Sequence, residues 1–355
     1  MKILAENNIN ITSRNTILDI INEKKKLISR PISLFPKISE KKRLLAEAKA
    51  LAAEAEKESK IAYLLLSDFK IEKENVNMYK NKSANIQNFA KYEYYSAKKI
   101  LDETGTLIKN EKKRKKENNN TYIRIKKKKF AGGIEINDYT NGELTRKILK
   151  IGNNITVTAI DINGETSIYS FDTEGNLLSY LEGVTSTEHE LKAKEKLTFS
   201  NGNLSEVSLE YEQYSDGSEA SKKRYIIVNN NLTEVFRSYK KYKNQETEVS
   251  ASEFFEFSRK DTPQRYCRNY SLSTSEEENC DLEFKYETID HLTYLKESRK
   301  TATQNSEEEK RYISRFKKRK LRAIYIQDIQ TKFLRYYTFD IEGNPTNYYE
   351  DTLDN

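Results

Sequence analysis

The spacing of apolar residues changes part way along the chain. Over residues 1–108 apolar positions recur in steps of three and four, the spacing of one helix face. From residue 130 onward apolar and polar side chains alternate, as in residues 207–211, which is typical of half-buried strands. The pattern predicts an α+β fold with a helical region (1–108), a basic linker (109–129) and a β-hairpin repeat domain (130–355).

Three helices are expected in the helical region, at residues 14–29, 39–67 and 82–109. Ser13 can cap the first, which ends before Pro31 because the residue before a proline is pushed out of the helical conformation. The other two carry apolar seams with coiled-coil spacing. The seam residues are Leu44, Ala48, Leu51, Ala55, Ala62 and Leu65, then Ile86, Phe89, Ala90, Ala97, Ile100 and Leu107. We expect an antiparallel helical hairpin, or a parallel coiled coil that makes the protein a homo-oligomer through residues 39–108.

A unit of about 28 to 30 residues repeats through the β region. In each unit a strand ends in an aromatic residue, a polar turn follows, and the next strand opens with a leucine. These leucines are Leu177, Leu204, Leu232, Leu292 and Leu321. About seven hairpins side by side would bury one continuous apolar face. We expect an open, curved antiparallel sheet, because a closed barrel of about fourteen strands would leave a lumen that these side chains cannot fill.

Two of the turns are nearly identical. Phe171–Leu177 (FDTEGNL) and Phe339–Pro345 (FDIEGNP) each place an aspartate, which can form an Asx turn, before a glycine that accepts positive φ. These segments resemble the turns of YD (Rhs-type) repeats and the hairpin repeats of MORN-variant proteins, over residues of about 140 to 350. The resemblance implies a scaffold or interaction role, and it transfers no catalytic residue.

Composition excludes a disordered chain and places the positive charge locally. The 24 Tyr and 14 Phe need a folded interior. The net charge of +7 is concentrated in residues 109–129. The candidate anion- or nucleic-acid-binding residues are Lys112, Lys113, Arg114, Lys115, Lys116, Arg124, Lys126, Lys127, Lys128 and Lys129, with Tyr122 and Phe130 available for base stacking. The simpler interpretation is a solvated linker, or the end of a helix followed by the first strand.

Little in the sequence suggests chemistry. No phosphate-binding glycine loop is present, and His189 and His291 have no metal-ligand spacing. We therefore expect no enzyme activity, cofactor or metal site. Cys267 and Cys280 are expected as reduced thiols. A cross-strand disulfide is the alternative, since a turn centred near Ser273–Thr274 would place them opposite each other.

The chain shows neither a secretory signal nor an apolar run of about 18 residues, so no membrane span is expected. We predict a cytoplasmic protein, with a virion or a non-Sec secretion route as alternatives. The predicted function is a non-enzymatic structural or protein-binding scaffold, bacterial or from a phage, that uses an extended β-repeat surface. A toxin-neutralising partner protein and a nucleic-acid-associated protein acting through the basic linker are the alternatives.

Overall fold

A computed structural model describes most of the chain in two compact units. The described residues are 30–105, 112–115, 122–186, 191–213, 219–243, 246–260, 262–272, 278–288, 291–303, 306–331 and 333–352. Unit 1 comprises Met1–Ser59 and Tyr294–Asn355, and unit 2 comprises Lys60–Thr293. One long helix followed by an antiparallel meander confirms the predicted α+β fold.

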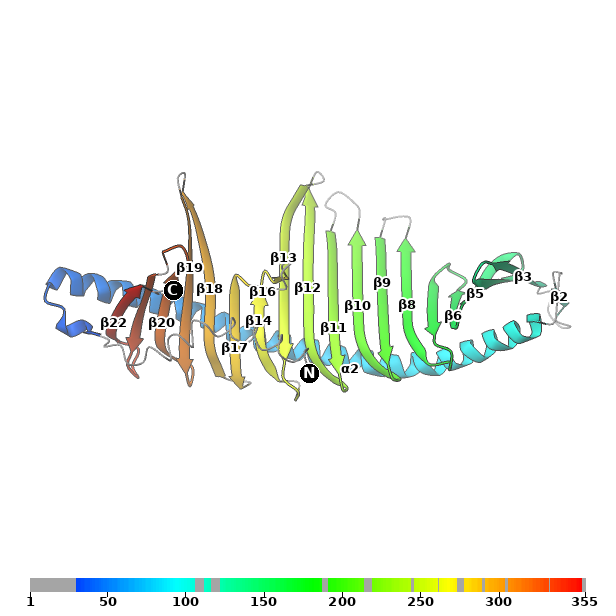
Figure 1. Ribbon diagram of the computed structural model, residues 1–355, viewed down its shortest axis with the longest axis horizontal. Coiled ribbons are helices and arrows are strands. Elements are labelled where there is room, and N and C mark those ends of the chain that lie inside the picture. The colour runs from blue at the N-terminus through cyan, green and yellow to red at the C-terminus, as the bar shows by residue number, and fades with distance from the viewer. Residues whose placement is uncertain are drawn as a thin grey trace. The chain divides into compact units, whose positions relative to one another are not determined.

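The helix α2 runs without a break from Ile38 to Gly105 (Figure 1). It includes residues 68–81, where the sequence predicts a polar connection between two helices, so the expected helical hairpin is wrong. No proline or glycine occurs between Ile38 and Glu103, so nothing interrupts the hydrogen-bond ladder. The predicted helix at 14–29 lies outside the described residues.

The apolar seam continues through the polar stretch of α2. Ala62, Phe69, Val76, Ser83, Ala90 and Ala97 follow one another at steps of seven. All six are buried in unit 2, where the seam faces the sheet. Phe89, predicted as a seam residue, is 66% exposed because it lies one position away from this row. The coiled-coil spacing therefore reflects packing on a sheet rather than on a second helix.

In unit 2 each strand of the sheet pairs antiparallel with the next along the chain. The strands are β2 (Lys112–Lys115), β3 (Tyr122–Phe130), β4 (Gly133–Thr140), β5 (Glu143–Ile151), β6 (Asn154–Ile160), β7 (Thr166–Phe171), β8 (Leu177–Ser186), β9 (Leu191–Ser200), β10 (Asn203–Gln213), β11 (Glu219–Val228), β12 (Asn231–Lys243), β13 (Glu246–Phe257), β14 (Pro263–Arg268) and β17 (Leu282–Thr288). A small separate pair joins β15 (Ser271–Leu272) to β16 (Glu278–Asn279).

Unit 1 continues the same pattern. Its strands are β18 (His291–Thr303, entering the unit at Tyr294), β19 (Ser306–Lys317), β20 (Lys320–Asp328), β21 (Phe333–Phe339) and β22 (Pro345–Thr352). The short strand β1 (Arg30–Pro31) pairs with β22, and the turn η2 (Ile32–Leu34) leads towards α2. Arg335 and Arg299 of this sheet reach Glu47 and Glu54 of α2 at 3.0 and 2.8 Å.

A row of directly opposed side chains forms the core of unit 2. Its members are Ile136, Ile148, Val157, Tyr169, Tyr180, Leu197, Val207, Tyr225, Val235, Phe255, Tyr266 and Phe284. Aromatic residues of α2 pack on this face. The ring of Phe69 lies 5.0 Å from that of Phe255, and Tyr79 lies 5.8 Å from Tyr225. In unit 2 one face of the sheet is thus apolar, as the alternation predicted, and α2 covers it.

The repeated turn motif corresponds to a β-bulge. Phe199 pairs with Leu204, but the next pair is Thr198 with Glu206, so one residue of the returning strand is skipped. The hydroxyl of the skipped Ser205 donates a hydrogen bond to the Thr198 carbonyl oxygen at 3.0 Å. The same one-residue shift follows Leu177, Leu232, Leu321 and Pro345. The bulge brings the leading residue and the residue three positions later to the same face of the sheet.

The two nearly identical turns have the predicted Asx geometry. Asp172 Oδ1 accepts hydrogen bonds from the backbone N–H groups of Glu174 and Asn176 at 2.9 and 2.8 Å. Asp340 makes the same bonds in the second turn. A side-chain hydrogen bond from Asn176, together with these backbone bonds, holds the pKa of Asp172 below its usual value.

Candidate functional site

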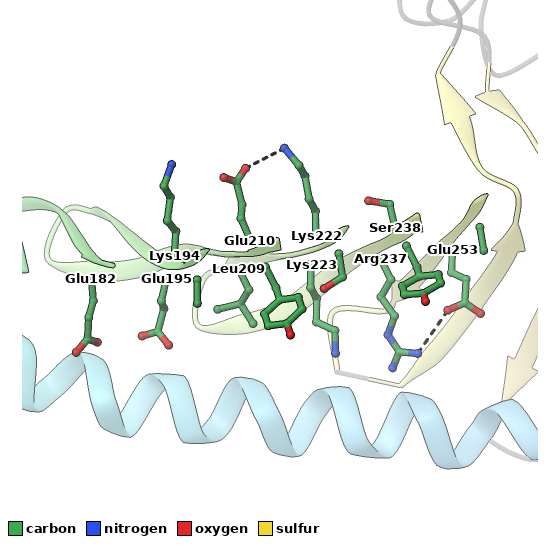
Figure 2. Close-up of a pocket in the computed structure, with 15 residues that line it drawn as sticks. Glu182, Lys194, Glu195, Leu209, Glu210, Lys222, Lys223, Arg237, Ser238 and Glu253 are labelled. Carbon is green, nitrogen blue, oxygen red and sulfur yellow. Dashed lines mark hydrogen bonds and ion pairs between the residues drawn. The ribbon is translucent and has the colours of Figure 1, made fainter. Parts of the chain in front are cut away.

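A groove of about 600 Å³ lies on the helix-facing side of strands β8 to β13. The strands that border it have 10 to 13 residues each, so they extend beyond the core row on which α2 packs. Figure 2 shows Glu182, Glu195, Lys223 and Arg237 pointing towards the helix, whereas Lys194, Glu210 and Lys222 point the other way. The groove is therefore the part of the covered face that α2 leaves open.

Two parallel rows of directly opposed residues line the groove. The row next to the core consists of Glu182, Glu195, Leu209, Lys223, Arg237 and Glu253. The outer row consists of Ala193, Tyr211, Ser221, Tyr239 and Ala251. Small and large side chains alternate along the outer row. Ser221 therefore forms a recess between the two tyrosine rings, and the alanines form recesses beside them.

The buried carboxylate of Glu72 joins α2 to the charged row. Its side chain is fully buried, and its carboxylate accepts a hydrogen bond from the Tyr225 hydroxyl at 2.6 Å and one from Lys223 Nζ at 3.1 Å. The Arg237 guanidinium also contacts it and lies 3.5 Å from Glu253. Burial lowers the pKa of Lys223 and raises that of Tyr225. This network fixes the helix against β11 and β12.

Lys82 of α2 holds the other end of the charged row. Its Nζ lies 2.6 Å from Glu195 and 2.9 Å from Glu182. Burial alone would lower the pKa of Lys82, but hydrogen bonds with these two carboxylates raise it. The charged side chains that line the groove and point towards the helix are Glu182, Glu195 and Glu253 against Lys223 and Arg237. Three carboxylates against two cations leave the floor negatively charged.

Nine of the ten predicted basic residues belong to strands. Lys112–Lys115 form β2 and Lys126–Lys129 lie in β3, so the strand alternative applies to much of the predicted linker, while Lys116 lies outside the described residues. Lys127 is directly opposite the buried Ile136, on the helix-facing side. Lys126 faces the other way, with its Nζ 5.3 Å from the centre of the Tyr139 ring. Alternation thus divides this basic run between two faces, and binding of nucleic acid there stays a prediction.

Cys267 and Cys280 are joined as a disulfide, with their Cα atoms 5.7 Å apart. The two do not face each other across the ladder, because Cys267 is directly opposite Glu283. The register places the turn centre near residue 275, not at Ser273–Thr274. Cys280 immediately precedes the last residue before β17, where the main ladder has ended, and this departure from the register lets the sulfur atoms meet.

Sequence reasoning missed the groove. The positions of its floor residues depend on pairs such as Glu72 with Arg237, which are 165 positions apart. A signal for Glu72 does exist: with Leu65 and Tyr79 it follows a second row of seven-residue steps in α2, so a carboxylate stands at a position where the helix is buried. Within the described ranges no three His, Cys, Asp or Glu side chains gather as metal ligands do. None of the described helical segments is long and apolar enough to cross a membrane.

Comparisons with known proteins add little to this geometry. No protein-family model matches the chain, and no curated protein matches it. Among solved structures, the tail fiber of Staphylococcus aureus phage P68 is similar at 9% identity, over 70% of this chain and 76% of the fiber chain, with a TM-score of 0.11. A score this low supports no argument about fold or function. The resemblance to YD and MORN-variant repeats stays a prediction.

Proposed function

We propose that this protein is a non-enzymatic binding scaffold whose groove beside α2 holds an amphipathic helix of a protein partner. The observation that supports this is the open strip of the helix-facing side, bounded by the charged row and the alternating Ala/Tyr/Ser/Tyr/Ala row. This strip continues an existing helix–sheet interface. A partner helix beside α2 would pack on the outer row as α2 packs on the core row.

The spacing of the outer row fits a helix that lies across the strands. Tyr211 and Tyr239 are two strands apart, a separation of roughly 9.6 Å. Seven residues of an α-helix advance roughly 10.5 Å. A partner with an apolar side chain at every seventh position would place successive side chains in the recesses at Ala193, Ser221 and Ala251. Since carboxylates outnumber cations along the floor, we expect the flanking residues of the partner to be basic.

Filling one recess tests this proposal. A synthetic helical peptide with Leu at every seventh position and Lys on its flanks is the probe, read by fluorescence anisotropy. Ser221→Trp closes the recess between Tyr211 and Tyr239 and should weaken binding by at least about tenfold. Ser238→Trp is the matched control, because Ser238 lies on the same part of the sheet but on the opposite face, and it should bind like wild type.

The outcome that contradicts the proposal is equal binding of the peptide to wild type and to Ser221→Trp. A peptide with Glu in place of Lys on its flanks should bind more weakly than the basic peptide at low salt. If the acidic peptide binds as well, the stated chemistry of the partner is wrong. Toxin neutralisation and nucleic-acid binding stay predictions.

A further inference from the structure

Three turns of unit 2 meet α2 at steps of seven residues along the helix. Each turn has a glycine or an asparagine two positions before its leading leucine, namely Gly175, Gly202 and Asn230. The Tyr94 ring lies against the first turn, and Lys80 Nζ donates a hydrogen bond to the Asn230 carbonyl oxygen of the third at 2.6 Å. Residue 87, seven positions from each of these helix residues, lies beside the middle turn.

The middle of these three contacts leaves a cavity. A Cβ added at Gly202 would meet no atom within 4 Å, whereas one at Gly175 would lie 2.5 Å from the Tyr94 ring. A cavity of about 300 Å³ lies here, between α2 and the turns that join β9 to β10 and β11 to β12 (Figure 1). Gln87 therefore stands at a place in the series where the helix side chain does not fill the space over the turn.

The lining of this cavity has cations and amides. Gln87, Asn88 and Asn203 carry side-chain amides, each of which presents hydrogen-bond donors and an acceptor. Lys80 and Lys91 carry ammonium groups, and Lys80 keeps two N–H donors after its bond to the turn. Among the described residues that line the cavity none is acidic. The lysines therefore favour an anionic group, and the amides match hydroxyl groups, which also both donate and accept.

The cationic and amide groups follow one face of α2. Lys80, Ala84, Gln87 and Lys91 are separated by steps of four, three and four, so they lie on one side of the helix. The two lysines are roughly 16 Å apart along the helix axis, with the amides between them. A ligand that fits this order has a hydroxylated middle and an anionic end.

We propose that this cavity binds an acidic sugar, a hydroxylated ring that carries a carboxylate or a phosphate group. The ring hydroxyls meet the amides of Gln87, Asn88 and Asn203, and the anionic group meets the ammonium group of Lys91. Lys80 is held at the third turn and adds positive charge at the other end. The site is independent of the groove and its partner helix, because no residue lines both.

The amide signal of Gly202 reports binding in the full-length chain. Isotope-labelled glycine gives a simple magnetic resonance spectrum, since the chain has 11 Gly. Gly202→Asn, which copies the residue at the corresponding place of the next turn, identifies the Gly202 signal by its loss. Glucuronic acid and glucose 6-phosphate should shift this signal to saturation, and the tighter of the two identifies the anionic group. Glucose alone and inorganic phosphate alone should each bind at least about tenfold more weakly than that sugar.

Substitutions on α2 test the two parts of the site. Lys91→Gln removes the charge and should weaken binding of the acidic sugar by at least about tenfold, with glucose binding changed by less than about twofold. Lys99→Gln is the matched control, because Lys99 is exposed on the same helix and does not line the cavity, and it should bind like wild type. Gln87→Tyr copies Tyr94 at the middle turn and should abolish binding of both acidic sugars by filling the cavity.

A Gly202 signal that neither acidic sugar shifts would overturn the proposal. Equal affinities of inorganic phosphate and glucose 6-phosphate would also overturn it, because the cavity would then be a plain anion site. The same holds for equal binding of the acidic sugar by wild type and Lys91→Gln. If Gln87→Tyr does not fold, as judged by circular dichroism, the comparison of Lys91→Gln with Lys99→Gln decides.

Discussion

Single residues decide how the charged row of unit 2 is held. Glu72 has no exposed surface, yet it carries the hydrogen bonds of Tyr225 and Lys223 and the contact with Arg237. A buried carboxylate is tolerated only when such partners replace the water it loses. Its removal would leave Arg237 and Lys223 beside a low-dielectric helix surface without their main counter-charge.

Replacing Glu72 by glutamine should therefore destabilise the protein strongly. We expect a loss of roughly 3 kcal/mol in the free energy of unfolding, because the amide keeps the shape but not the charge. Glu74→Gln is the control: its carboxylate is 66% exposed in an ion pair with Lys70, and it should change stability by about 0.5 kcal/mol or less. Urea unfolding followed by circular dichroism measures both. Similar midpoints for the two variants would contradict the role assigned to Glu72.

At the scale of elements, the repeat of the sheet matches the repeat of the helix. One hairpin advances roughly 9.6 Å across the sheet and one heptad roughly 10.5 Å along the helix. In unit 2, Tyr94 contacts Phe171 of β7, Tyr79 contacts Tyr225 of β11, and Phe69 contacts Phe255 of β13. The strands of unit 2 thus follow α2 from its C-terminal end towards its N-terminal end. Successive pairs of strands pack on successive heptads of the helix.

The two nearly identical turns, Phe171–Leu177 and Phe339–Pro345, differ in how closely a helix side chain approaches the turn glycine. Gly175 and Gly343 have φ of +90° and +92°, but a Cβ at Gly175 would lie 2.5 Å from the Tyr94 ring of α2, whereas one at Gly343 meets nothing within 4 Å. Gly343→Ala should lower the free energy of unfolding by about 1 kcal/mol, from backbone conformation alone. Gly175→Ala should lower it by about 2 kcal/mol more, since Tyr94 must also move. Equal thermal stabilities of the two variants would show that Tyr94 does not pack closely there.

The outer side of α2 bears on the predicted homo-oligomer. The seam that suggested an oligomer is occupied by the sheet, so an oligomer through α2 would have to use other residues. Leu64, Ile71, Met78 and Tyr92 are 50 to 71% exposed on the far side of the helix, with steps of seven, seven and fourteen. Light scattering of the full chain tests the predicted homo-oligomer. A monomer at tens of micromolar, on the order of the dissociation constants of weak dimers, would contradict that prediction.

For the whole molecule, the buried tyrosines set the alkaline limit of stability. Burial raises the pKa of Tyr169 to about 12, and it also raises the pKa values of Tyr225, Tyr266, Tyr286 and Tyr337. An unfolded tyrosine ionises near pH 10. Above that pH the unfolded chain releases protons that the native chain keeps, so the free energy of unfolding falls as pH rises.

We expect the urea midpoint to change little between pH 8 and about 9.5 and to decrease progressively from about pH 10 to 12. Lys223 and Lys127, whose pKa values are lowered by burial, act in the opposite direction, but they are two groups against several tyrosines. Tyrosine absorbance near 295 nm, followed across the same range, should show one class that ionises near pH 10 and another that ionises only on unfolding. A single class near pH 10 would contradict the burial of these rings.

The sequence by itself determined the local features of this protein. Period-two alternation, the aromatic–turn–leucine repeat and the Asx turns follow from side-chain and backbone preferences of neighbouring residues, and these features are confirmed. The three-residue step from each leading leucine to the next buried residue, as from Leu204 to Val207, also indicates the bulge, because a regular strand would place those two residues on opposite faces. The continuity of the helix was predicted wrongly, although the steps of seven through Phe69 and Val76 were present in the sequence.

Only the tertiary structure decided what each apolar face packs against. A seam at steps of seven suits a second helix or a sheet whose hairpins have nearly the same spacing, and nothing local distinguishes the two. The groove likewise depends on Glu72 meeting Arg237 and on Lys82 meeting Glu195, contacts between segments more than a hundred residues apart. Such pairings are set by the register of the helix along the sheet of unit 2, a property that no short stretch of sequence contains.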